Sequence, residues 1–266
     1  MKPFGECRVA VVGVGLLGGV LLERLLTCWE CIFQPIIACE PNPERRAEIA
    51  GWAGVTATDD NLQAAEADVI VLAVPPGQVI PVLKTLAVRL TPEHLVVSAA
   101  AAVPLAAMGE AAGGGVPVVR TLPNSPALVG EGVTPVCYGR AVTPEARALA
   151  ERLLACWGEA IEIPEAQMNL CVGLTAAAPT MIFPVIAALA QAGTDGGLDP
   201  VVALRLAARV VRGSGALVLE GGRSPAALMA LTPLQPLRQA EARALFAEAV
   251  GKAAAGADGL QARLGL

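Results

Sequence analysis

Three glycines near the N-terminus have the spacing of a loop that binds phosphate groups. Gly13, Gly15 and Gly18 follow one apolar run, RVAVV, and precede another, VLLERLL. In a strand–loop–helix unit the first glycine permits a tight turn, the second lets backbone approach a pyrophosphate, and the third lets the helix pack on the strand. The helix N-terminus then faces the phosphates. The expected dinucleotide-binding residues here are Gly13, Val14, Gly15, Leu16, Leu17 and Gly18; a tight turn without a ligand is the alternative.

A carboxylate at the end of the next apolar run bears on the choice of dinucleotide. Glu40 lies 22 residues beyond Gly18. At that place a carboxylate accepts hydrogen bonds from a ribose 2′-hydroxyl and repels a 2′-phosphate, which favours NADH over NADPH. Arg45 and Arg46 follow on the next expected helix and are within reach of a phosphate, so NADPH stays open. The alternative role for Glu40 is to cap the following turn.

The run LAVPP, residues 72–76, ends a strongly apolar strand. Ligands of doubly wound sheets bind beyond the carboxyl ends of strands, where the strand order reverses. Ala73, Val74 and Pro75 are therefore expected beside the cofactor, although stiffening of a turn also explains the prolines.

Composition narrows the other classes of function. The net charge is −5 and the chain has no Lys/Arg run, so nucleic acid is not expected as a partner. The cysteines are scattered in apolar surroundings, which predicts reduced thiols in a cytoplasmic protein. The one CxxC, Cys28 to Cys31, lacks further ligands, and the only histidine is His94, so no metal site is expected.

Two apolar segments resemble membrane signals. The N-terminal run is better explained by the strand–loop–helix pattern than by a signal peptide. Residues 166–194 contain no charged side chain, but two prolines, an Asn and two Gln interrupt the segment. It is therefore expected to be an interface helix rather than a membrane span.

The elements that must position these residues follow one pattern as far as residue 163. Apolar runs of strand length alternate with helical periodicity, which predicts a mainly parallel Rossmann sheet of the α/β class. Beyond residue 164 only helical periodicity recurs, broken by GTDGGLDP and EGGRSP. We expect a dinucleotide-binding domain at residues 1–163 and an all-α dimerisation and substrate domain at residues 164–266.

Several segments resemble the pyrroline-5-carboxylate reductase family. VVRTLPNSPALVGEGVTPV, residues 118–136, is similar to its R-x-M-P-N-x-P-A-x-V-G-x-G-x-T signature, with Leu122 in place of Met. VVSAAAAVPLAAM, residues 96–108, resembles its S-x-A-A-G-I stretch, with Ala102 in place of Gly. LAVPP resembles A-V-K-P, and AALAQAGTDGGLDP resembles A-L-A-D-A-G-V-x-x-G-L-P.

The resemblance implies an NAD(P)H-dependent reductase that converts 1-pyrroline-5-carboxylate to L-proline. It implies a homodimer or larger homo-oligomer, with each site between one cofactor domain and the partner's helices. It places Asn124 beside the nicotinamide and the substrate cavity, and Ala100 is expected among the cofactor contacts. The residues expected to contact substrate are Asn124, Thr175, Thr180 and Thr232. The alternative for Asn124 is an Asx-turn in a rigid connection.

The departures from the family concentrate where the substrate is expected. Residues 175–179 read TAAAP where the family has S-G-S-G-P, and residues 228–239 read LMALTPLQPLRQ where it has S-P-G-G-T-T. Three alternatives follow: the usual substrate in a rebuilt pocket, a different imine, or a non-catalytic dinucleotide-binding relative. Imine reduction demands little of the protein beyond positioning and exclusion of water. The three lysines, Lys2, Lys84 and Lys252, and His94 are poorly placed for alcohol or ketone chemistry, which needs an acid–base group.

Overall fold

The computed structural model describes residues 6–28 and 35–266. The CxxC segment therefore lies outside the described residues except for Cys28. The chain divides into two compact units. The sheet unit comprises Met1–Ala177 and Val250–Leu266, and the helical unit comprises Ala178–Ala249. This division by contacts falls at a different place from the expected boundary at residue 164, which stays a prediction.

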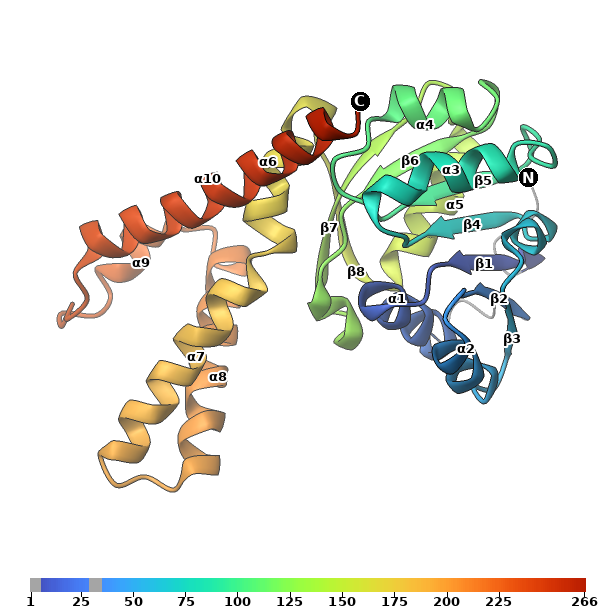
Figure 1. The fold of residues 1–266 in the computed structure, drawn as a ribbon. Helices are drawn as coiled ribbons and strands as arrows, with labels where there is room; N and C mark the ends of the chain where they lie inside the picture. Colours follow the sequence, from blue (N-terminus) through green and yellow to red (C-terminus); the bar gives the residue numbers. More distant parts are fainter. Residues whose placement is uncertain (1–5, 29–34) are drawn as a thin grey trace. The chain divides into compact units, whose positions relative to one another are not determined.

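The described residues of the sheet unit form one eight-stranded sheet in the order β3-β2-β1-β4-β5-β6-β7-β8 (Figure 1). All neighbouring strands are parallel except β6 and β7. The reversal from β2 to β4 on either side of β1 creates the switch point at which ligands of such sheets bind. The predicted Rossmann class is thus confirmed. The strands are β1 (Val9–Val12), β2 (Ile36–Cys39), β3 (Val55–Thr58), β4 (Val69–Leu72), β5 (Leu95–Ser98), β6 (Val118–Thr121), β7 (Gly132–Tyr138) and β8 (Gly158–Glu162).

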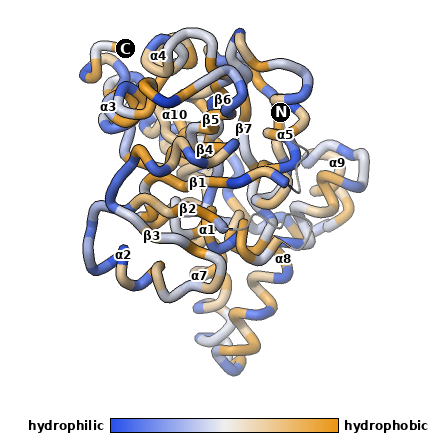
Figure 2. Tube along the Cα trace, turned by 90° about the vertical axis from the view of Figure 1, so that its right-hand side faces the viewer, coloured by the Kyte–Doolittle hydropathy of each residue, from blue (hydrophilic) through white to orange (hydrophobic). Residues whose placement is uncertain are grey.

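Helices cover both faces of the sheet. One face packs on α1 (Leu16–Thr27), α2 (Pro43–Ala50) and α5 (Pro144–Ala155). The other packs on α3 (Pro76–Leu86), α4 (Leu105–Ala111) and the 3₁₀ helix η2 (Asn61–Glu66). The central strands are buried on both faces, so they read as continuous apolar runs rather than alternating ones; Figure 2 shows this apolar character through β1 and β4.

Local signals explain where some of these helices begin and end. The side chain of Asn42 accepts hydrogen bonds from the amides of Glu44 and Arg45, and Gly51 ends α2, as the sequence predicted. The short helices η2, α4 and η3 (Ser125–Val129) were not predicted. Each is too short for helical periodicity to emerge from a single sequence.

The sheet unit also contains helical segments that follow β8. These are η4 (Glu165–Gln167), α6 (Met168–Cys171) and a π-helical turn, η5 (Val172–Ala176). The last residues of α10 (Gln239–Arg263) belong to the same unit. A side chain at Gly173 would lie 2.4 Å from the carbonyl oxygen of Val250, so this glycine lets η5 and α10 approach closely.

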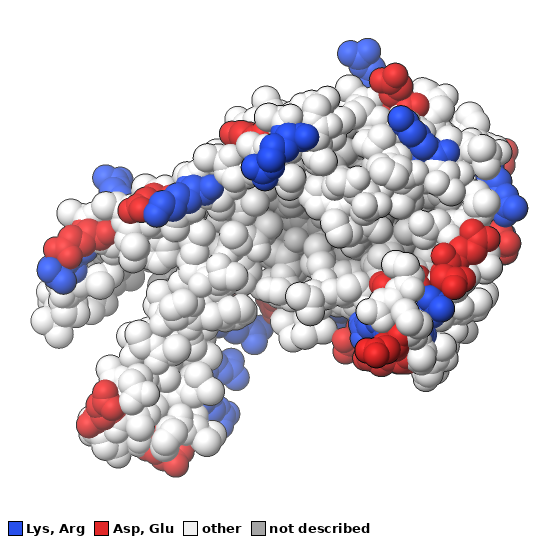
Figure 3. Space-filling model, in the orientation of Figure 1, with Lys and Arg blue, Asp and Glu red and all other residues white. Residues whose placement is uncertain are grey.

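The helical unit is built from α7 (Pro179–Asp195), α8 (Pro200–Glu220), α9 (Pro225–Met229) and the first part of α10. α7 and α8 pack along each other. Large apolar side chains on both helices are exposed, among them Phe183, Leu189 and Val210. On the face drawn in Figure 3, most of this unit's surface is uncharged.

One helical stretch of the described residues, Glu165–Asp195, has the length and apolar composition of a membrane span. The expectation that it is an interface helix stays a prediction.

Candidate active site

The three loop glycines are required for three different reasons. Gly13 adopts φ +85°, and a side chain there would meet Val74 at 2.8 Å. A side chain at Gly18 would lie 1.9 Å from the carbonyl oxygen of Gly13. At Gly15, by contrast, no described atom other than those of its chain neighbours lies within 4 Å of the place a side chain would occupy. Gly13 and Gly18 therefore serve the turn and its packing, whereas Gly15 borders open space.

The start of α1 fits a phosphate group. Gly15 is the N-cap, and no described side chain caps this helix end. The first amides of a helix lack intrahelical partners and carry partial positive charge. With Gly15 open and these amides uncapped, the loop can receive a pyrophosphate. Leu16 is 97% exposed at this point, and Leu17 and the buried Val14 complete the loop.

The end of β4 meets the same loop. The backbone of Ala73 and the side chain of Val74 lie beside Gly13, and Pro75 begins the turn into α3. The structure thus brings Ala73 and Val74 against the glycine loop; that they lie beside the cofactor stays a prediction. Ala100 is buried just beyond the end of β5.

Glu40 is built into the loop. It is 8% exposed, and its Oε2 accepts a hydrogen bond from the amide of Val14 at 2.8 Å. Its Oε1 accepts from the amide of Asn42 at 2.9 Å, so it caps the following turn as well. Each carboxylate oxygen retains a further acceptor site for a hydroxyl group.

The two arginines that follow Glu40 are both engaged by protein groups. Nε of Arg45 donates to the carbonyl oxygen of Val14 at 2.9 Å. Arg46 donates to the carbonyl oxygens of Glu40 and Pro41 and pairs with Asp59 at 3.3 Å. The contact of Arg45 with the loop was missed by sequence reasoning, which considered this arginine only as a phosphate ligand.

Asn124, in the middle of the signature segment of residues 118–136, makes two side-chain hydrogen bonds. Asn124 accepts a hydrogen bond from the amide of Val133 at 3.0 Å and donates to the carbonyl oxygen of Thr175 at 3.2 Å. The hydroxyl of Thr175 donates to the carbonyl oxygen of Cys171. Asn124 therefore joins the signature loop to the π-helical turn, a type of turn frequent at functional sites.

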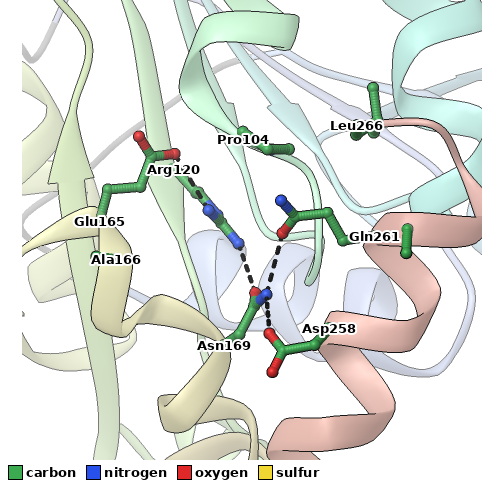
Figure 4. A pocket seen from close by; sticks show the side chains of 9 residues that line it. Pro104, Arg120, Glu165, Ala166, Asn169, Asp258, Gln261 and Leu266 are labelled. Carbon is green, nitrogen blue, oxygen red and sulfur yellow. Dashed lines mark hydrogen bonds and ion pairs between the residues drawn. The ribbon is translucent and has the colours of Figure 1, made fainter.

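Arg120, near the start of the signature segment, is a buried anchor. It pairs with Glu165 at 3.1 Å and donates to Asn169 at 3.0 Å. Asn169 in turn donates to Asp258 and Gln261 of α10, and these side chains line a cavity of about 480 Å³ (Figure 4). The first residue of the signature thus holds α6 and α10 on the sheet, a role that needs contacts across the chain.

The alanines that replace family glycines have different consequences in two places. Ala102 adopts φ 63°, alone among the non-glycine residues that the structure describes, and it is fully buried. The left-handed region costs alanine about 1 kcal/mol relative to glycine. Ala178 stands at the second glycine of the S-G-S-G-P stretch, and its right-handed helical angles accommodate alanine without backbone strain.

Three other residues considered from the sequence do not belong to the glycine loop or to the signature segment. Thr180 is in the first turn of α7, and Thr232 follows α9, both in the helical unit. His94 precedes β5, at the edge of the sheet opposite the glycine loop, and its Nδ1 accepts a hydrogen bond from the amide of Thr91.

Burial raises the pKa of the Cys39 thiol to about 12, so this side chain stays neutral. No cluster of metal-binding side chains occurs within the described ranges.

Comparisons with known proteins agree with this arrangement. Residues 8–102 match the family described as "NADP oxidoreductase coenzyme F420-dependent", and residues 165–260 match "Pyrroline-5-carboxylate reductase dimerisation". The chain is 35% identical over 224 residues to a pyrroline-5-carboxylate reductase of Escherichia coli, covering 84% of this chain and 83% of that relative. It is 32% identical over 256 residues to one of Methanosarcina acetivorans, covering 92% and 95%.

Solved structures extend the likeness. A pyrroline carboxylate reductase of Plasmodium falciparum with NADP bound has a TM-score of 0.85 at 20% identity, covering 97% of this chain and 100% of that chain. One from Coxiella burnetii has a TM-score of 0.80 at 27% identity, covering 96% and 98%. At these identities the first likeness bears on the fold, while the sequence relatives bear on the family. This chain belongs to the pyrroline-5-carboxylate reductase family.

Proposed function

We propose that this protein reduces 1-pyrroline-5-carboxylate to proline, using a reduced nicotinamide dinucleotide. The observation that carries the proposal is the uncapped start of α1 beside the open Gly15, together with the signature loop braced by Asn124. Relatives that are 32–35% identical to this chain are named pyrroline-5-carboxylate reductases. These relatives disfavour the non-catalytic alternative.

The chemistry asks the protein to bind and orient rather than to supply a nucleophile. When bound, a reduced nicotinamide would supply hydride to the carbon of the protonated imine, and the electrons of the C=N π bond would pass to nitrogen to leave a neutral amine. The glycine loop and Glu40 would hold the dinucleotide, with Ala73, Val74, Pro75, Ala100 and Asn124 beside it. We assign substrate contacts to Asn124 of the dinucleotide-binding domain and to Thr175, Thr180 and Thr232 of a substrate domain that begins near residue 164. The helices of this second domain would contact a second copy of the chain.

We infer a preference for NADH. Glu40 points a carboxylate into the loop, where a 2′-phosphate would be repelled. Arg45 is committed to the loop carbonyl, and Arg46 to a turn and to Asp59. Both arginines are thus already engaged by protein groups, which supports the preference.

The assembly and location follow from the same family. We infer a homodimer or larger homo-oligomer through the helical unit, in the cytoplasm, with no nucleic acid or membrane partner. The exposed apolar side chains of α7 and α8 support a helix-to-helix interface.

The replacement of the family's hydroxyl-rich segment by residues 228–239 favours a second candidate, reduction of a different cyclic imine. This segment retains Thr232 but has Leu and Pro where the family has Gly and Thr. Apolar side chains favour a substrate without the carboxylate.

The test is dinucleotide oxidation by the purified protein, followed by absorbance, with proline measured by mass spectrometry. NADH and NADPH are compared with and without 1-pyrroline-5-carboxylate, and with 1-pyrroline as the uncharged imine. Faster oxidation with the carboxylate-bearing imine and equimolar proline support the proposal. Turnover of 1-pyrroline alone would establish the second candidate, and dinucleotide binding without turnover of either imine would contradict both.

A further inference from the structure

We propose that Arg45 is a positioning residue for the dinucleotide loop, and that Gly19 provides the space for its side chain because glycine has none. The inference rests on the proposed use of a nicotinamide dinucleotide. It concerns residues outside the three-glycine motif and explains a fourth glycine, at position 19, that the motif does not require.

Arg45 holds one of the two peptide groups that flank Val14. Its Nε donates to the carbonyl oxygen of Val14 at 2.9 Å. That carbonyl shares a planar trans peptide with the amide of Gly15, so the two groups point in opposite directions. Fixing the carbonyl toward Arg45 therefore also fixes the direction of the Gly15 amide, which points away from the guanidinium contact.

Glu40 holds the other flanking peptide. Its carboxylate accepts from the amide of Val14 at 2.8 Å. A carboxylate and a guanidinium group from the β2–α2 segment thus form hydrogen bonds with the peptide groups on either side of Val14. We call these contacts of Arg45 and Glu40 with Val14 the Val14 clamp. With both peptide planes fixed, the loop amides need little reorganisation when an anion binds.

The rest of the guanidinium group is also held. One terminal nitrogen pairs with Glu48 at 2.6 Å, and the group stacks over the ring of Trp52 at 5.3 Å from its centroid. Planar guanidinium geometry permits these contacts at the same time, whereas a lysine ammonium cannot reproduce them.

Gly19 leaves the space that Arg45 occupies. A side chain at position 19 would come within 2.5 Å of the second terminal nitrogen of Arg45. That nitrogen is the far end of a flexible side chain, so a methyl group would displace the arginine rather than break the backbone. Gly19→Ala should therefore release the Val14 carbonyl while the domain stays folded.

The test combines Arg45→Gln, Gly19→Ala and the double variant in the full-length protein. Arg89→Gln and Gly109→Ala are the matched controls, because Arg89 is exposed at the other edge of the sheet and a methyl group at Gly109 in α4 would meet no atom within 4 Å. Three readouts are needed: NADH affinity by fluorescence titration, KM and kcat for NADH, and thermal unfolding.

Arg45→Gln should raise the Kd and KM for NADH about tenfold, the effect of losing one hydrogen bond to a charged group, with kcat and Tm close to wild type. Gly19→Ala should act in the same direction. The double variant should be no worse than Arg45→Gln, because both changes remove the same contact.

Two results would overturn the clamp. One is NADH affinity in Arg45→Gln equal to that of Arg89→Gln. The other is full additivity of Gly19→Ala and Arg45→Gln, which would mean that Gly19 does not act through the arginine. Failure of the wild type to bind either dinucleotide would instead overturn the proposed function, a result visible before any variant is made.

Discussion

The sheet unit and the helical unit bury their apolar residues in different ways. In the sheet unit, β1, β2, β4, β5 and β6 are buried along their whole length between two layers of helices. In the helical unit, α8 buries only Ala203 and Ala207 among its residues, while Val210 is 60% exposed.

The sheet unit buries its apolar side chains within one chain, whereas the helical unit would bury many of its apolar side chains only against a second copy. Burial of apolar surface contributes about 25 cal/mol per Å², and the sheet unit obtains it within one chain. The helical unit leaves many large apolar side chains exposed, as is typical of residues that form an interface. We therefore expect the sheet unit to stay folded in a single chain, whereas the helical unit should need a second copy of the chain to be stable.

The largest expected effect isolates ligand binding from folding in the sheet unit. Gly15→Val should abolish dinucleotide binding and leave the Tm near wild type, because the side chain enters space that no protein atom occupies. Gly18→Val is the contrast: its side chain meets the Gly13 carbonyl and should lower the Tm sharply. Fluorescence titration and thermal unfolding measure the two properties. Normal NADH binding by Gly15→Val would show that the pyrophosphate site is misplaced.

The next effect addresses the helical unit. Val210→Glu should dissociate the oligomer, weakening association roughly 100-fold or more, because a carboxylate would be buried without a partner. Imine reduction should fall with it, while NADH binding by the sheet unit persists. Light scattering after size exclusion measures the mass.

Val88→Glu is the matched control, since Val88 is 79% exposed on the sheet unit. An unchanged mass for Val210→Glu would remove α8 from the interface.

A smaller effect sharpens the choice of dinucleotide. Glu40→Gln replaces one acceptor oxygen by an NH₂ group that faces a backbone amide of Val14 or Asn42. The KM for NADH should rise about tenfold, since a hydrogen bond to a charged group is lost. The KM for NADPH should rise less, because repulsion of the 2′-phosphate is relieved as well. Equal changes for both dinucleotides would show that Glu40 acts on the loop alone.

The smallest effect concerns backbone strain in the sheet unit. Ala102→Gly should raise the free energy of unfolding by up to about 1 kcal/mol, because glycine adopts φ 63° without steric cost and this gain is partly offset by the greater freedom of the unfolded chain. Urea unfolding of the two proteins measures it. Ala177→Gly is the control and should destabilise, since Ala177 has right-handed helical angles. A loss of stability in Ala102→Gly would contradict the strain.

Much of the sheet unit could be predicted from sequence because its signals are local. The spacing of Gly13, Gly15 and Gly18, the cap at Asn42 and the apolar runs of the strands each act over a few residues. The antiparallel pairing of β6 with β7 and the short helix α4 could not be predicted in the same way, since neither leaves a period in the sequence.

The sequence by itself determined the strands and most of the longer helices, the glycine loop between β1 and α1, and the resemblance that led to the family. Only the tertiary structure decided which side chains meet across distant elements: Glu40 and Arg45 at Val14, Asn124 at Thr175, and Arg120 at Glu165 and Asn169. The physical reason is that backbone conformation follows from neighbours along the chain. A hydrogen bond between segments depends on how a whole sheet and its helices pack.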